Sequence, residues 1–222
     1  MESNQFDLSL GLDGTHVVVT GGAGLIGSVV VKAFIAAGSS VSSLDIRHER
    51  VTRVSEQLLE IEADISSTES MEKAWADAEH DFGPVICCVA LASLDLSVLK
   101  HHDSAADMSL EQFKRTMDIN VGGTFLTAKL WLQGLREQRA TWGRAIEDRK
   151  KNVGLIMVGS ESGWFGERSN ADYAASKSAV QVGLLQSLKS DVPRVWPGAR
   201  YGSPCIHQSH LIRMKNRDHM LV

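Results

Sequence analysis

Short, continuous apolar runs alternate along this chain with longer segments whose apolar residues recur at helical spacing. The apolar runs predict buried strands at residues 15–20, 40–46, 58–64, 84–90 and 153–160. The segments with helical spacing predict helices at residues 24–38, 66–80, 109–139 and 171–191. Unbroken apolar strands have both faces covered, and their alternation with helices implies parallel crossovers. We therefore predict an α/β fold, an open, doubly wound parallel sheet in three layers.

Local signals support several of these boundaries. The stretches SSTE (66–69) and SLEQ (109–112) are capping boxes that open two of the helices, and Gly38 ends the first one. A break at Gly122-Gly123 is considered in the third helical region. Residues 92–108 form a long irregular connection, and the charged residues 140–152 are expected to form a surface loop.

Length, charge and cysteine content narrow the class of protein. The chain has 222 residues, which suggests one domain, and its net charge of −4 argues against nucleic acid or an anionic membrane as the main partner. The start lacks the pattern of a signal peptide, and no apolar run is long enough to cross a bilayer. Three cysteines are too few for a disulfide framework. We expect a cytoplasmic protein with reduced thiols.

A glycine-rich turn joins the first predicted strand to the first predicted helix. Gly21, Gly24 and Gly27 are spaced so that the backbone can turn tightly and a pyrophosphate can approach the helix N-terminus. Asp45 ends the second strand, where a carboxylate accepts the hydroxyls of an adenosine ribose and repels a 2′-phosphate. This favours NAD, although Arg47 is close enough to help bind the phosphate of NADP. The alternative is a structural turn with a surface aspartate.

Polar residues that could act on a carbonyl lie at the same edge of the predicted sheet. Ser160 ends a strand, and Tyr173 and Lys177 are one helical turn apart near the start of the following helix. Ligands of open α/β sheets bind beyond the carboxyl ends of the strands, so these residues are expected to meet there. Asn120 lies in the preceding helical region.

Together these motifs resemble the short-chain dehydrogenase/reductase family over residues 12–200. The resemblance rests on TGGAGLIG, Asp64 in EADIS, Asn120 in DINVGGTF, Ser160 in VGSESG, and YAASK. It implies a Rossmann-type NAD(P)-binding domain over residues 1–200, with Asp64 and Ile65 near the adenine, and a catalytic tetrad of Asn120, Ser160, Tyr173 and Lys177. The implied cofactor contacts are Gly21, Gly24, Leu25, Ile26, Gly27, Asp45, Asp64, Ile65, Ala90, Tyr173 and Lys177.

The chemistry of the tetrad also follows from the residues themselves. A phenol is a poor base at neutral pH, so the pKa of Tyr173 has to fall, and a nearby Lys177 ammonium would favour the phenolate. Ser160 can hydrogen-bond the substrate oxygen. The family resemblance implies that Asn120 holds a water molecule that links Lys177 to solvent. The alternatives are that Ser160 is a cap, Asn120 a helix-break residue and Lys177 a solvated charge.

The chain departs from the family pattern in three places. Its glycine spacing is that of the extended branch, whereas the distance from Ser160 to Tyr173 fits the compact branch, to which we assign it. Leu91 stands where the family has a glycine after the fourth strand. Residues 201–222 show no strand pattern, so we expect a divergent tail, with the last strands of the sheet missing. The leading hypothesis is an NAD(P)-dependent oxidoreductase that interconverts a carbonyl and an alcohol. The alternative is a dinucleotide-binding protein with little or no turnover.

The sequence also bears on metal binding and on assembly with other subunits. His101 and His102 are adjacent and lack ligand spacing, so we expect them to be exposed or on a substrate rim, and we predict no metal site. His207, His210 and Cys205 could form a ligand cluster, but a disordered tail is the preferred interpretation. The family resemblance implies a homodimer or homotetramer formed by two long helices. Its apolar residues would be Phe125, Leu126, Leu130, Leu132, Val180, Leu184 and Leu188.

Overall fold

A seven-stranded sheet forms the centre of the molecule. The computed structural model describes residues 10–142, 152–197, 199–202 and 205–206. The strands lie in the order β3-β4-β2-β1-β5-β6-β8. Their bounds are β1 (His16–Thr20), β2 (Ser40–Asp45), β3 (Val51–Ser55), β4 (Leu58–Glu62), β5 (Cys87–Ala90), β6 (Gly154–Met157) and β8 (Arg200–Gly202). Neighbouring strands are parallel except for β3, which is antiparallel to β4. The predicted doubly wound sheet is confirmed.

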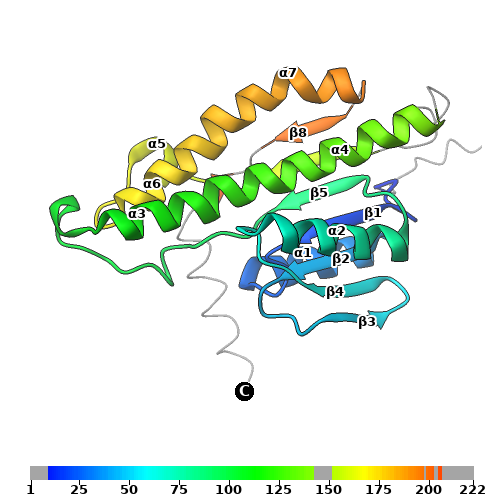
Figure 1. Cartoon of the computed structure of the whole chain (residues 1–222), viewed down its shortest axis with the longest axis horizontal. Helices are drawn as coiled ribbons and strands as arrows, with labels where there is room; N and C mark the ends of the chain where they lie inside the picture. Colours follow the sequence, from blue (N-terminus) through cyan, green and yellow to red (C-terminus); the bar gives the residue numbers. More distant parts are fainter. Residues whose placement is uncertain (1–9, 143–151, 198, 203–204, 207–222) are drawn as a thin grey trace, which may run out of the picture.

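Two long helical rods lie side by side along the sheet (Figure 1). One consists of α3 (Leu110–Met117), the π-helical turn η2 (Asp118–Gly123) and α4 (Thr124–Trp142), and the other of α6 (Ala171–Ser178), the π-helical turn η4 (Ala179–Leu184) and α7 (Leu185–Val195). The remaining helices are α1 (Leu25–Ala36), α2 (Thr68–Phe82), the 3-10 turn η1 (Ala105–Asp107) and the short α5 (Ser162–Phe165). The helix considered to break at Gly122-Gly123 instead continues through η2. A Cβ at Gly123 would lie 2.5 Å from Ile65 Cδ1, so close packing explains that glycine.

The two faces of the sheet carry separate apolar clusters. The larger one joins β strands to α2, α4 and α7 through residues such as Trp75, Trp131 and Val192. The smaller one packs α1 against Val17, Val41 and Val89 on the other face. These clusters give the three predicted layers.

Most of the residues proposed for a subunit interface belong to the larger cluster. Leu126, Leu130, Val180 and Leu188 are buried within the subunit. Leu132 and Leu184 are partly buried against the same cluster, whereas Phe125 remains exposed. Most of the apolar residues that suggested a subunit interface are therefore buried in the subunit's own core.

Several boundaries differ from the sequence-based prediction. Strand β3 was not predicted, because all five of its side chains are exposed and leave no buried pattern. The predicted strand at 153–160 is divided into β6 and β7 (Gly159–Ser160), with Val158 between them. The cap of α2 is Ser67, which accepts a hydrogen bond from the amide of Ser70. Ser66 instead bonds to the carboxylate of Asp64.

The predicted loss of the last strands is partly wrong. Residues 200–202 form β8, which pairs in parallel with β6, and Cys205–Ile206 form β9, which pairs with β7. The proposed domain boundary after residue 200 falls inside β8. Without β8, the edge of β6 would present unpaired backbone groups, and a segment of three residues is enough to add a strand there. Such a segment is too short to show periodicity in the sequence. His207 and His210 lie outside the described residues.

Candidate active site

The glycine turn between β1 and α1 forms one end of a large pocket. Gly21 adopts a φ of +73°, and a Cβ there would lie 2.8 Å from the Cα of Ala92. A Cβ on Gly27 would lie 2.0 Å from the carbonyl oxygen of Gly21, so a side chain is excluded there too. The pocket is lined at this end by Gly21, Gly24, Leu25, Ile26 and Gly27, the residues predicted to contact the cofactor.

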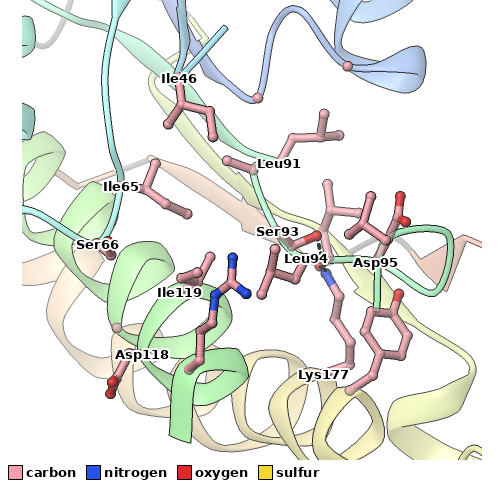
Figure 2. A pocket seen from close by; sticks show the side chains of 18 of the residues that line it. Ile46, Ile65, Ser66, Leu91, Ser93, Leu94, Asp95, Asp118, Ile119 and Lys177 are labelled. Carbon is pink, nitrogen blue, oxygen red and sulfur yellow. Dashed lines mark hydrogen bonds between the residues drawn. The ribbon is translucent and has the colours of Figure 1, made fainter. Parts of the chain in front are cut away.

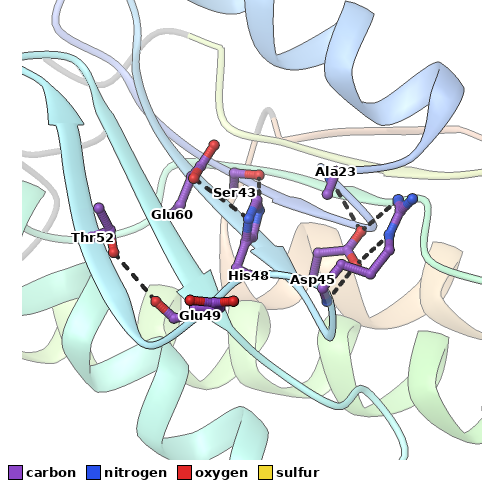
Figure 3. A network of polar contacts seen from close by, with 8 residues as sticks. Ala23, Ser43, Asp45, His48, Glu49, Thr52 and Glu60 are labelled. Carbon is purple, nitrogen blue, oxygen red and sulfur yellow. Dashed lines mark hydrogen bonds and ion pairs between the residues drawn. The ribbon is translucent and has the colours of Figure 1, made fainter.

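Asp45 lies beside this turn and is already engaged by its neighbours (Figure 3). Its carboxylate accepts hydrogen bonds from the amide of Ala23 at 3.1 Å and from the amide and guanidinium of Arg47 at 3.0–3.4 Å. Burial raises the pKa of Asp45, but the hydrogen bonds and charge of Arg47 outweigh it and hold the pKa below its usual value. Asp45 is therefore an ionised carboxylate at the end of β2.

A second polar contact fastens the turn that carries Arg47. His48 Nε2 lies 2.9 Å from Ser43 Oγ, and His48 Nδ1 lies 3.6 Å from a carboxylate oxygen of Glu60. Ser43 lies directly below the glycine turn, because a Cβ on Gly22 would approach its hydroxyl to 2.1 Å. The connection after β2 is thus tied to both β4 and the glycine turn (Figure 3).

The predicted contacts beyond Asp45 lie on the pocket wall with one exception. Asp64 and Ile65 both line the pocket. Ala90 does not, because it is buried inside β5. The wall at this point begins with Leu91, whose amide, like that of Ala92, donates to the hydroxyl of Thr20. Figure 2 shows Leu91 on the wall, close to the segment Ser93–Asp95.

Ser160, Tyr173 and Lys177 meet at the other end of the pocket and all three line it. The side chain of Ser160 lies close enough to that of Tyr173 to lower the pKa of the phenol. Ser160 is held in place because its Oγ accepts from the amide of Ser162 and its amide donates to Gln181 Oε1. Lys177 Nζ lies 5.7 Å from the centroid of the Tyr173 ring. It donates to the carbonyl of Val158 at 3.0 Å and lies 3.3 Å from Ser93 Oγ.

The electrostatics around Tyr173 differ from the expectation. Burial raises the pKa of Tyr173, and the nearby carboxylates of Asp95 and Glu167 raise it further, while the hydrogen bond with Ser160 lowers it. The net pKa lies above that of a free phenol. Burial also lowers the pKa of Lys177 to about 8, against which the charge of Asp95 acts. The residues of the chain alone therefore favour the neutral phenol.

The side chain of Asn120 forms its hydrogen bonds with Leu94 and Ser176 rather than with Tyr173 or Lys177. Its Oδ1 accepts from the amide of Leu94 at 2.7 Å, and its Nδ2 donates to the carbonyl of Leu94 and to Ser176 Oγ, both at 3.0 Å. Its carbonyl accepts from Thr124 Oγ1 at 2.6 Å. The side chain thus fastens the segment after β5 to the two long helical rods.

The pocket that joins these two ends has a volume of about 1770 Å³. Pockets for drug-sized ligands usually span roughly 300–1,000 Å³. Its middle is lined by the apolar side chains Ile46, Ile65 and Ile119, which Figure 2 shows opposite Lys177 and Asp95. The space is large enough for an extended dinucleotide.

Sequence reasoning missed several residues of this site. Ser93 and Asp95 lie in a connection without periodicity, so their position against Lys177 and Tyr173 left no signal. His101 is exposed and lines the pocket, as a rim residue would, whereas His102 is buried. Within the described residues, no group of three His, Cys, Asp or Glu side chains could hold a metal ion. None of the helices described here is both long and apolar enough to span a membrane.

Most of the chain matches the model of one protein family. Residues 15–195 match the short chain dehydrogenase model. This chain belongs to the short-chain dehydrogenase/reductase family. The matched region contains the glycine turn, Asp45 and all four residues of the predicted tetrad.

Relatives and solved structures agree with this membership. The chain is 28% identical to the acetoacetyl-CoA reductase of Synechocystis over 195 residues, covering 88% of this chain and 70% of the relative. It is 28% identical to the 3-oxoacyl-[acyl-carrier-protein] reductase MabA of Mycobacterium bovis over 178 residues, covering 80% of this chain and 63% of MabA. The NADH complex of the 3-ketoacyl-(acyl-carrier-protein) reductase from Brucella melitensis superposes with a TM-score of 0.75 at 22% identity, over 88% of this chain and 76% of that one. That likeness concerns the fold.

Proposed function

We propose that this short-chain dehydrogenase/reductase interconverts a carbonyl and an alcohol with a nicotinamide dinucleotide. The observation that carries the proposal is that Ser160, Tyr173 and Lys177 line the same pocket as the glycine turn. Ionisable groups with perturbed pKa values in a large cleft are typical of catalytic sites. The two named relatives are both reductases, which supports this reaction class.

The cofactor's binding site is formed by residues at both ends of the pocket. Gly21, Gly24 and the first amides of α1 would hold the pyrophosphate, and Asp45 would accept the hydroxyls of the adenosine ribose. Asp64 and Ile65, which line the pocket, would contact the adenine. When bound, the nicotinamide supplies or accepts the hydride. We propose NAD as the preferred form, since Asp45 would repel a 2′-phosphate.

The residues of the chain supply the proton and orient the substrate. Tyr173 would donate its phenolic proton to the carbonyl oxygen during reduction and take it back during oxidation. Ser160 would hydrogen-bond the same oxygen and fix its distance to Tyr173. Lys177 would stabilise the phenolate, helped by the positive charge of an oxidised nicotinamide. Asn120 would hold the Leu94 segment in place beside them.

A paired binding and turnover experiment tests this function. NADH should bind with measurable affinity, and the chain should oxidise it in the presence of a 3-oxoacyl thioester such as acetoacetyl-CoA or of a simple ketone. Oxidation of NADH without a carbonyl substrate sets the background. Binding without turnover across a broad carbonyl panel would favour the alternative, a dinucleotide-binding protein. Absence of NADH and NADPH binding would contradict both.

A homodimer remains part of the proposal, with a smaller interface than the sequence suggested. Phe125 is 51% exposed, and it borders a shallow groove together with Leu132 and Leu188 on the two long rods. We expect a dimer mass by light scattering at micromolar concentration, and Phe125→Glu should shift it towards the monomer. Phe165→Glu is the matched control, because Phe165 is exposed on α5, away from that groove. A monomeric mass of the unmodified chain would exclude the dimer.

A further inference from the structure

Asp172, directly before Tyr173, is a fully buried carboxylate outside the pocket lining. Its Oδ1 accepts from the amide of Tyr173 at 2.9 Å. Its Oδ2 accepts from Thr116 Oγ1 at 2.7 Å and from Gln112 Nε2 at 3.2 Å. In the part of the chain that the structure describes, no cation forms an ion pair with Asp172. A buried carboxylate persists only when hydrogen bonds satisfy it, so these three donors define its position.

Gln112 extends this contact to the connection that follows β5. Its Nε2 also donates to the carbonyl of Lys100 at 3.2 Å, and its Oε1 accepts from His102 Nε2 at 2.8 Å. The same stretch is held from the other side, since Asn170 Nδ2 donates to Lys100 O and the amide of His102 donates to the carbonyl of Ser169. Residues 100–102 are therefore fixed to α3 and to the start of α6.

The other end of this stretch is tied to the same helix. Asn120 holds both backbone groups of Leu94 and donates to Ser176 Oγ, which in turn donates to the carbonyl of Tyr173. Residues 94–102, here called the wall segment, provide six of the pocket-lining residues: Leu94, Asp95, Leu96, Ser97, Val98 and His101. The wall segment is thus anchored at both ends to α6 around Tyr173.

We propose that Asp172 is a positioning residue that sets the wall segment at a fixed distance from the Tyr173 hydroxyl. This inference rests on the proposed function, because the wall segment would contact the carbonyl substrate. One carboxylate oxygen fixes the backbone of Tyr173, and the other fixes the α3 side chains that hold residues 100–102. A displacement of about 1 Å at a reacting centre can lower the rate by about 100-fold. Asp172 should therefore act on substrate turnover, while the glycine turn and Asp45 at the other end of the pocket are unaffected.

Exchanging the hydrogen-bond donor and acceptor between residues 172 and 112 tests whether Asp172 positions the wall segment. Asp172→Asn places an amide donor against the Gln112 donor, and Gln112→Glu places one carboxylate against another. The double variant D172N/Q112E restores one donor facing one acceptor, while the carbonyl oxygen of the new side-chain amide still accepts from the backbone amide of Tyr173. Thr116→Val removes a single donor to Asp172, and Thr116→Ser is its conservative control. This pair replaces the exchange as the test if the variants at residues 172 and 112 do not fold.

Asp172→Asn, Gln112→Glu and Thr116→Val should each lower kcat for the carbonyl substrate by about tenfold or more, whereas the double variant should recover most of it and Thr116→Ser should change it little. The NADH dissociation constant should stay within about twofold in all of them. Hydrogen exchange at the amides of Leu94 and His102 gives a readout that is independent of turnover. Exchange should accelerate in the single variants and slow again in the double variant.

Two results would overturn the proposal. One is unchanged kcat and unchanged exchange in correctly folded single variants. The other is a double variant no better than the worse single variant by either measure. If the unmodified chain turns over no carbonyl, the proposed function fails, and exchange at Leu94 and His102 still decides whether Asp172 anchors the wall segment.

Discussion

The Lys177 ammonium lies 5.7 Å from the centroid of the Tyr173 ring and is hydrogen-bonded to the carbonyl of Val158. The two residues are therefore neighbours on one helix face, as their spacing requires. In this arrangement the ammonium lies over the aromatic ring, and the side chain of Ser160 lowers the pKa of the phenol. In the proposed function, the hydroxyl of Tyr173 would exchange a proton with the substrate.

Tyr173→Phe should abolish most of the turnover and leave cofactor binding nearly intact. Only the hydroxyl is lost, and general acid–base catalysis by a positioned side chain typically contributes about 10²–10⁴-fold. Steady-state kinetics and NADH titration measure the two effects. Ser162→Ala is a suitable control, because Ser162 is buried nearby and its hydroxyl is bonded to Glu167. Turnover of the Tyr173→Phe variant at the unmodified rate would show that another group donates the proton.

Lys177→Met should change how stability depends on pH. The folded-state pKa of Lys177 is lowered to about 8 from 10.5 because burial disfavours its charge. The unfolded chain therefore holds a proton that the folded chain loses between these values, so the unmodified protein gains stability as pH rises through this window. Methionine cannot titrate and lacks this gain.

Urea unfolding without cofactor at pH 7.0 and pH 9.5 measures this difference. Between these pH values the unmodified protein should gain about 2 kcal/mol of unfolding free energy relative to Lys177→Met. Comparing the two proteins cancels the titration of all other groups. Lys189→Met on the same helical rod is the control and should show no such difference. Parallel pH dependence of Lys177→Met and the unmodified chain would mean that Lys177 keeps its ordinary pKa in the folded state.

The sequence predicted the parts of the site that depend on local spacing. The glycine turn follows a strand, Ser160 ends a strand, and Tyr173 lies near the start of a helix. All of them therefore lie at the same edge of the sheet, as its topology requires. Contacts over long separations could not be predicted. Asp172 meets Thr116 across 56 residues, and Asn120 meets the backbone of Leu94. Nothing in the spacing of these residues encodes either pairing.

Two strands, β3 and β8, could not be predicted from the sequence for a different reason. Strand β3 is fully exposed, and β8 has three residues, so neither contains an apolar alternation that could be recognised. Both lie at the edges of the sheet, where pairing depends on backbone groups of a neighbouring strand rather than on side-chain pattern. Ala90 was expected to contact the cofactor, but the strand places it under the wall that Leu91 forms.

Leu91→Gly should strengthen NADH binding. Leu91 lines the pocket just beyond β5, where the resemblance to the family predicts a glycine next to the cofactor. Removing its side chain should free space for the dinucleotide and lower the NADH dissociation constant by about threefold or more, roughly 0.7 kcal/mol. Leu96→Ala is the matched control, because Leu96 lines the pocket from the wall segment and should change the KM for substrate instead. Weaker NADH binding by Leu91→Gly would show that the leucine packs against the cofactor.

Asp45→Ser should shift cofactor preference towards NADPH. Asp45 carries its negative charge where the adenosine ribose would bind, and it also holds the guanidinium of Arg47. Serine removes the repulsion of a 2′-phosphate and releases Arg47, whose side chain is 59% exposed, to pair with that phosphate. The ratio of the NADPH to the NADH dissociation constant should fall by about tenfold, or ~1.4 kcal/mol, in parallel fluorescence titrations. Glu49→Ser removes the same charge from an exposed position four residues away and should leave the ratio unchanged. A preference for NADPH in the unmodified chain would mean that Arg47 already dominates Asp45, and the loss of Asp45 would then alter the ratio little.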